Sequence, residues 1–226
     1  MPVWSPDGSR IVFQSTCGDG RARLYQKNAN GEGLDQRLSE TSGVNLQDVS
    51  PDGRLIVYMI IGPSRHFELW VLPLAGDHTP YPFLQTPFNN SQAQVSPDGR
   101  WIAYTSTESG RDEVYVQSFP VPGSKRQVSI DGGAQPRWRR TGGELYYLAP
   151  DQVLMALSVK SGTLMEVGRP SALFRTRLNF AGTQGPRFMA GYSPSADGQR
   201  FVLNVPTDQP VAPITVVLNW TAALKR

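Results

Sequence analysis

A four-residue turn motif recurs along the chain at nearly constant spacing, and it constrains the fold more than any other feature of the sequence. The motif is Ser-Pro-Asp-Gly followed by an apolar run, and intact copies begin at Ser5, Ser50 and Ser96, which are 45 and 46 residues apart. A degraded copy begins at Arg139 and keeps little more than its glycine, and a fifth copy begins at Ser195. A period of about 45 residues indicates an array of one supersecondary unit.

The residue types of the motif suit a hairpin turn. Proline fixes φ at about −65°, the aspartate side chain forms hydrogen bonds with the local backbone, and glycine takes the left-handed conformation. The recurring acids also invite the alternative of a carboxylate ring or a cation site, but the turn supplies a complete structural reason for them. We therefore assign a structural turn role to Ser5, Pro6, Asp7, Gly8, Ser50, Pro51, Asp52, Gly53, Ser96, Pro97, Asp98, Gly99, Asp197 and Gly198.

Four short strands fit into each repeat. In the third repeat we expect the first strand at 89–95, before the turn, and the second in the apolar run directly after the turn. The third and fourth strands are expected at 113–119 and 126–130. Four strands in about 45 residues are typical of a β-propeller blade. The sequence thus predicts an all-β propeller of about five four-stranded antiparallel blades in a single domain, 1–226. The expected blades are 2–42, 43–87, 88–132, 133–180 and 181–226. A sandwich or a solenoid of hairpins is the structural alternative.

The first and last repeats are short. Only residues 2–4 precede the first turn, and the apolar run at 214–220 would be the third strand of the last blade. We therefore expect the ring to be incomplete or open, and the chain to be part of a longer protein. An open ring exposes strand edges, which would favour self-association.

Targeting and charge features are few. The first residues lack a basic segment followed by an apolar one, so no signal peptide is predicted in the sequence as given. The most apolar run, 55–61, is far shorter than the roughly 20 residues of a bilayer span, so no membrane segment is predicted. The chain has 22 Lys and Arg against 19 Asp and Glu, interspersed, and this balance does not favour nucleic-acid binding.

Residues that could hold a metal or a cofactor are sparse. Cys17 is the single cysteine, and neither His66 nor His78 stands at a recognised ligand spacing from it. The glycine pairs at 18–20 and 31–33 lack the third glycine and the helix of a dinucleotide-binding motif. The sequence predicts neither a metal site nor a cofactor.

Catalytic motifs are also missing from the sequence. The glycine-rich loop, the His-Arg-Asp loop and the Asp-Phe-Gly motif of kinases do not occur. The nearest match to a nucleophile elbow is 191–195, centred on Ser193, but it ends in serine and precedes an expected strand where the elbow needs a helix. We predict no catalytic residue and no enzymatic activity.

One basic and aromatic cluster could bind a ligand. It consists of Arg137, Trp138, Arg139 and Arg140. Arginine beside an aromatic ring could hold an anionic or glycan-like ligand, or an acidic patch on a protein. The interpretation that we prefer is structural, with Trp138 packed between blades and the arginines facing solvent or pairing with acids.

The repeats resemble the TolB-like, WD40-like β-propeller repeats of bacteria. In the second half, 109–116, 133–140 and 213–220 are similar to the C-terminal propeller of bacterial membrane serine/threonine kinases. The resemblance implies a periplasmic or other extracytoplasmic module that senses or docks a protein partner or a small ligand at a propeller rim, without catalysis. The alternative is an accessory propeller of a peptidase or hydrolase whose catalytic domain lies outside this chain.

Overall fold

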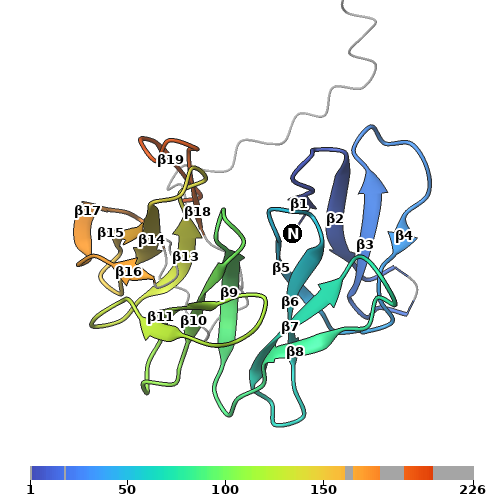
Figure 1. Cartoon of the computed structure of the whole chain (residues 1–226), viewed down its shortest axis with the longest axis horizontal. Helices are drawn as coiled ribbons and strands as arrows, with labels where there is room; N and C mark the ends of the chain where they lie inside the picture. Colours follow the sequence, from blue (N-terminus) through green and yellow to red (C-terminus); the bar gives the residue numbers. More distant parts are fainter. Residues whose placement is uncertain (1, 18, 161–164, 179–190, 206–226) are drawn as a thin grey trace, which may run out of the picture.

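The computed structural model describes residues 2–17, 19–160, 165–178 and 191–205, and every regular element in these ranges is a β-strand. The strands form antiparallel sheets that follow one another along the chain, and the first strand of each lies toward the middle of the molecule (Figure 1). We number these sheets as blades 1 to 5. Nowhere in the described ranges does the chain form an apolar helix of membrane-spanning length.

Each of the first three blades has four strands in sequential order. Blade 1 contains β1 (Val3–Trp4), β2 (Arg10–Ser15), β3 (Arg23–Asn28) and β4 (Gln36–Arg37). Blade 2 contains β5 (Asn45–Val49), β6 (Leu55–Ile61), β7 (Phe67–Pro73) and β8 (Tyr81–Leu84). Blade 3 contains β9 (Asn90–Val95), β10 (Trp101–Ser106), β11 (Glu113–Ser118) and β12 (Lys125–Gln127).

The last two blades depart from this pattern. Blade 4 contains β13 (Ala134–Trp138), β14 (Glu144–Leu148), β15 (Val153–Lys160), β16 (Glu166–Val167) and β17 (Ser171–Arg175), and its outer strand is split because β16 and β17 pair with opposite ends of β15. Blade 5 has β18 (Tyr192–Pro194) and β19 (Phe201–Leu203) among the described residues, and the strand expected at 214–220 lies outside them. The predicted all-β propeller, open or incomplete, is confirmed.

One expected strand boundary is wrong. The strand predicted at 126–130 ends at Gln127. Beyond it, Val128 N and Ser129 N both donate to Val114 O, at 2.9 and 3.5 Å, and Ser129 Oγ accepts a hydrogen bond from Val114 N at 2.7 Å. A side chain therefore takes the place of the backbone carbonyl in the ladder, and regular pairing ends there.

The recurring turns share one set of hydrogen bonds. In blade 3, Ser96 Oγ donates to Asp98 Oδ1 at 2.5 Å, and the same carboxylate oxygen accepts from Arg100 N at 3.2 Å. Gly99 has φ 71°, and its N–H donates to Ser96 O at 2.8 Å. The corresponding glycines of the other turns, Gly8, Gly53 and Gly198, have φ of 70°, 71° and 72°. Each aspartate thus serves the backbone of its own turn.

Truncating one of these acids should cost modest stability. We expect Asp98→Ala to lower the free energy of unfolding by about 1–2 kcal/mol, because it removes the acceptor for Ser96 Oγ and Arg100 N. Asp98→Asn keeps an acceptor oxygen and should lose less than half as much. Urea unfolding followed by tryptophan fluorescence would measure both, and equal losses for the two variants would contradict the hydrogen-bond explanation.

The apolar core lies between adjacent blades. Successive residues of a strand point to opposite faces, so each sheet contributes side chains to two core clusters. In β6, Val57 packs against blade 3, whereas Ile56 and Tyr58 pack against blade 1. In β10, Ile102 packs against blade 2 and Trp101 against blade 4. Burial on both faces explains the nearly continuous apolar runs of these strands.

Polar side chains join consecutive blades, from β2 in the case of Gln14 and from the inner strands in the other blades. Each interface has a side-chain oxygen of the earlier blade that accepts from a backbone N–H of the later one. The pairs are Gln14 Oε1 with Leu46 N (2.8 Å), Gln47 Oε1 with Ala93 N (3.0 Å), Asp48 Oδ2 with Val95 N (2.8 Å), Gln92 Oε1 with Gln135 N (2.9 Å), Gln94 Oε1 with Trp138 N (2.7 Å) and Gln135 Oε1 with Gly191 N (2.7 Å). These contacts satisfy backbone donors on the inner strand edges, and we call them the interblade acceptors.

Candidate functional site at the channel mouth

A cavity of about 730 Å³ opens where the inner strands of all five blades end. These strands, β1, β5, β9, β13 and β18, surround the middle of the molecule (Figure 1). The rim carries Trp4, which is 59% exposed, and a set of prolines. The rim prolines are Pro2, Pro6, Pro51, Pro97 and Pro194. We call this cavity the channel mouth.

Two oppositely charged residues line the channel mouth from different blades. Asp48 of β5 and Arg137 of β13 each stand two residues before the start of their turn. Burial raises the pKa of Asp48 to about 6, against the lowering effects of hydrogen bonds from Val95 and Val49 and of the charge of Arg137. Burial likewise lowers the pKa of the Arg137 guanidinium. Both side chains are partly buried, so both charges are only partly solvated.

Neither charge forms an ion pair with another described residue. Arg137 Nη1 donates to Pro136 O at 2.8 Å, and Asp48 Oδ2 accepts from Val95 N. Poorly solvated charges without a close partner reduce the stability of a fold. Strongly perturbed ionisable groups in a cavity are a mark of functional sites.

Gln94 and Tyr192 complete the polar wall. Gln94 stands at the position equivalent to Asp48 and Arg137, and within the described part of the chain its amide Nε2 enters no hydrogen bond. Tyr192 OH donates to Gln135 O at 2.9 Å, and burial raises the pKa of this phenol. The channel mouth thus offers free donors on Arg137 and Gln94, and acceptor oxygens on Asp48.

Neutralising Asp48 should stabilise the protein at neutral pH. Its pKa in the fold, about 6, lies above the ordinary value of 3.8, so the folded state binds more protons than the unfolded state between these values and stability falls as the pH rises through them. We expect Asp48→Asn, which keeps an acceptor for Val95 N, to raise the free energy of unfolding by about 2 kcal/mol at about pH 7.5 and by little at about pH 4. Denaturant titrations at both pH values would measure this. A gain independent of pH would contradict the burial of the charge.

Three residues of the predicted ligand cluster, Arg137, Trp138 and Arg140, line the channel mouth, whereas Arg139 does not. Trp138 is 6% exposed and packs between blades 3 and 4, with Nε1 donating to Gln94 O at 3.1 Å. Arg139 donates to Glu144 Oε2 at 3.1 Å and to Gly142 O at 2.7 Å, so it holds its own turn. Arg140 is exposed at the rim. Of the two arginines that line the channel mouth, Arg137 is thus the one that is partly buried.

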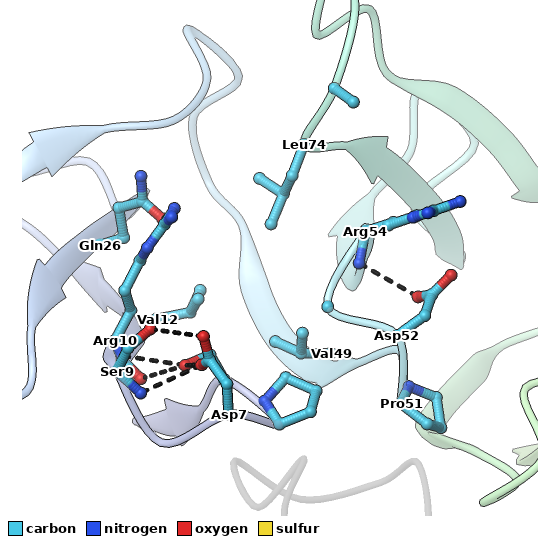
Figure 2. A pocket seen from close by; sticks show the side chains of 14 residues that line it. Asp7, Ser9, Arg10, Val12, Gln26, Val49, Pro51, Asp52, Arg54 and Leu74 are labelled. Atoms are coloured by element: carbon cyan, nitrogen blue, oxygen red, sulfur yellow. Dashed lines mark hydrogen bonds between the residues drawn. The ribbon is translucent and has the colours of Figure 1, made fainter.

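Two grooves extend outward from the channel mouth between adjacent turns. One of about 470 Å³ lies between blades 1 and 2, and Figure 2 shows the carboxylates of Asp7 and Asp52 turned toward their own turns there. The hydroxyl of Ser5 and the other hydrogen bonds of that turn lower the pKa of Asp7 to about 2. The second groove, of about 490 Å³, lies between blades 3 and 4. The turn acids therefore do not form a common site.

Asp48 and Gln94 are site residues that sequence reasoning missed. A usable signal exists, because both precede the serine of an intact turn by two residues, as Arg137 precedes Arg139. Ser193, the centre of the elbow-like segment, occupies the same position in β18 and lines the channel mouth.

Comparisons with known proteins give the fold its name. No family model and no curated protein matches the sequence of the chain. The structure is similar to TolB from Acinetobacter baumannii, with a TM-score of 0.64 and 20% identity over 88% of this chain and 46% of that one. It is also similar to a protein assigned as TolB from Agrobacterium tumefaciens, with a TM-score of 0.61 and 18% identity over 76% of this chain and 63% of that one. The chain has the fold of a TolB-like β-propeller.

The chain is also similar to part of a larger enzyme. A puromycin-hydrolyzing peptidase of Mycobacterium tuberculosis matches this chain with a TM-score of 0.63 and 19% identity, over 88% of this chain and 32% of the peptidase. The chain therefore spans less than two thirds of each of these structures, and the likeness describes a propeller scaffold.

Proposed function

We propose that the chain is a non-catalytic recognition scaffold that binds a ligand or a segment of a partner protein at the channel mouth. The observation that carries the proposal is the pair Asp48 and Arg137, two partly buried charges that form no ion pair among the described residues and that line an open cavity between all five blades. Such an arrangement costs stability and gives the fold little in return, whereas a ligand with matching charges would compensate both groups.

Within a larger protein, the scaffold would be the extracytoplasmic sensor or docking part. The resemblance to TolB-like repeats and to kinase-associated propellers supports this assignment, as do the two TolB structures that the chain matches over part of their length. The second candidate is an accessory propeller of a peptidase, favoured by the peptidase structure of which this chain matches 32%. In either case the binding surface would be the turn-bearing face around the channel mouth.

Fluorine NMR of the fluorotryptophan-labelled chain would test the binding proposal. Trp4 and Trp138 line the channel mouth, whereas Trp70 lies in blade 2 with its Nε1 bonded to Glu68 and serves as an internal control. In a screen of charged fragments and short peptides, we expect hits to shift the Trp4 and Trp138 resonances and to leave that of Trp70 in place. Hits that shift only Trp70, or a screen without any hit, would contradict the proposal.

An activity assay separates a scaffold from an enzyme. We expect the purified chain to turn over neither peptides nor esters. Ser193 is the residue to test, because it is exposed in the channel mouth on β18. Turnover that is abolished by Ser193→Ala, with the melting temperature unchanged, would overturn the scaffold assignment.

A further inference from the structure

We propose that the channel mouth selects ligands that carry a carboxylate at one end and an amine at the other, with Arg137 and Gln94 holding the carboxylate and Asp48 the amine. This inference rests on the function proposed above and specifies the chemistry of the ligand. It follows from three neighbouring blades, which present a cation, an amide and an anion at equivalent positions two residues before their turns.

The carboxylate half of the site has unused donors. A guanidinium has five N–H groups in a planar fork, and that of Arg137 uses one of them on Pro136 O. Gln94 accepts from Trp138 N through Oε1, which fixes the amide and leaves its two Nε2 donors available. A carboxylate bound by an arginine fork and an amide would form charge-assisted hydrogen bonds, which are stronger than neutral ones.

The amine half of the site has unused acceptors. An ionised carboxylate offers about four lone-pair directions, and the backbone N–H groups of Val95 and Val49 use about two of those of Asp48. An ammonium group beside Asp48 would stabilise the ionised carboxylate that burial now disfavours. The apolar rim of Trp4 and prolines suits the methylene groups that would join the two charged ends.

The two charges together provide selectivity. A ligand with a carboxylate alone leaves Asp48 uncompensated and places a second negative charge in the same cavity. A ligand with an amine alone leaves Arg137 uncompensated and places a second positive charge there. Discrimination of this kind depends on the buried charge that the wrong ligand leaves unpaired. A zwitterionic ligand compensates both.

Isothermal titration with a graded series of compounds would test this inference. The probes are glycine, β-alanine, γ-aminobutyrate and 6-aminohexanoate, with propionate and propylamine as single-charge references. We expect the best zwitterion to bind about tenfold or more tightly than either reference, with an optimum chain length set by the separation of Asp48 and Arg137. Triglycine added as a further probe would show whether a peptide provides the two ends better than a free amino acid does.

Three variants complete the test. Arg137→Gln should reduce the affinity for the zwitterion to that for propylamine, and Asp48→Asn should reduce it to that for propionate. Arg54→Gln is the matched control, because Arg54 lines the groove between blades 1 and 2 outside the channel mouth. Equal affinities for zwitterions and single-charge references, or full zwitterion binding by Arg137→Gln, would overturn the inference. Fragments that still shift Trp4 in that case would leave the proposed function standing.

Discussion

Replacing Gln92 by alanine is expected to lower the free energy of unfolding by about 3 kcal/mol. Gln92 Oε1 accepts from Gln135 N of the next blade at 2.9 Å and from Thr105 Oγ1 at 2.8 Å, and both donors are buried. Each unsatisfied buried donor costs about 1–3 kcal/mol. Thermal and urea unfolding would measure the loss.

Gln152 provides a matched control for this prediction. Gln92 and Gln152 both have a left-handed backbone, with φ of 56° and 69°, but the side chain of Gln152 forms no hydrogen bond within the described part of the chain. Gln152→Ala should therefore cost less than about 1 kcal/mol. Gln92→Gly removes the strain of a left-handed backbone but does not restore the lost acceptor. Its free energy of unfolding should therefore stay close to that of the alanine variant. Similar losses for Gln92→Ala and Gln152→Ala would show that backbone conformation, and not the interblade acceptor, is responsible.

Replacing Glu113 by alanine is expected to cost about 3–4 kcal/mol. The carboxylate of Glu113 is 0% exposed and accepts from Gly132 N at 2.9 Å, from Arg111 Nε at 2.8 Å and from Ser129 Oγ. Alanine would leave the buried N–H of Gly132 and the hydroxyl of Ser129 without their acceptor, just beyond the point where regular strand pairing ends at Gln127. Denaturant titration of the purified variant would measure the loss.

Asp131 is the control for the contribution of charge. Arg111 also pairs with Asp131 at 3.4 Å, but that carboxylate is 87% exposed. Exposed ion pairs contribute about 0–1 kcal/mol, so Asp131→Asn, which removes the charge and suits the left-handed backbone at this position (φ 64°), should be nearly neutral. Glu113→Gln keeps one acceptor oxygen and should lose about half of what alanine loses. A large loss from Asp131→Asn would instead assign the stability to the ion pair of Arg111.

The architecture could be predicted from the sequence because local chemistry and long-range pattern agree. The turn motif recurs with a blade-length period, and its glycines have the positive φ that such turns need. The strand predicted at 126–130 failed because Ser129 bonds the backbone with its side chain, which strand propensity does not describe. The division of the outer strand of blade 4 into β16 and β17 was not predicted either, because no turn motif in the sequence marks it.

The candidate site was harder to predict than the fold. Alternation along a strand tells which positions face inward, but it does not tell which residues of different blades face one cavity. Arg137 was singled out for its neighbours Trp138 and Arg139, yet its charged counterpart is Asp48, 89 positions earlier in the sequence. Comparing equivalent positions across the blades, and not neighbours within one blade, would have identified both.

The interblade acceptors all lie on the earlier of two blades and accept from the later one, and they connect adjacent blades. Every such bond runs from one blade to the next, so among the described residues the interblade acceptors link each blade to its immediate neighbours, and disruption at one interface need not reach the blade after it. Asp48 and Arg137 belong to blades 2 and 4, which are not neighbours. A ligand that binds both would connect blade 2 to blade 4 and so stabilise the two interfaces that lie between them. Binding at the channel mouth would then make the arrangement of these blades more rigid.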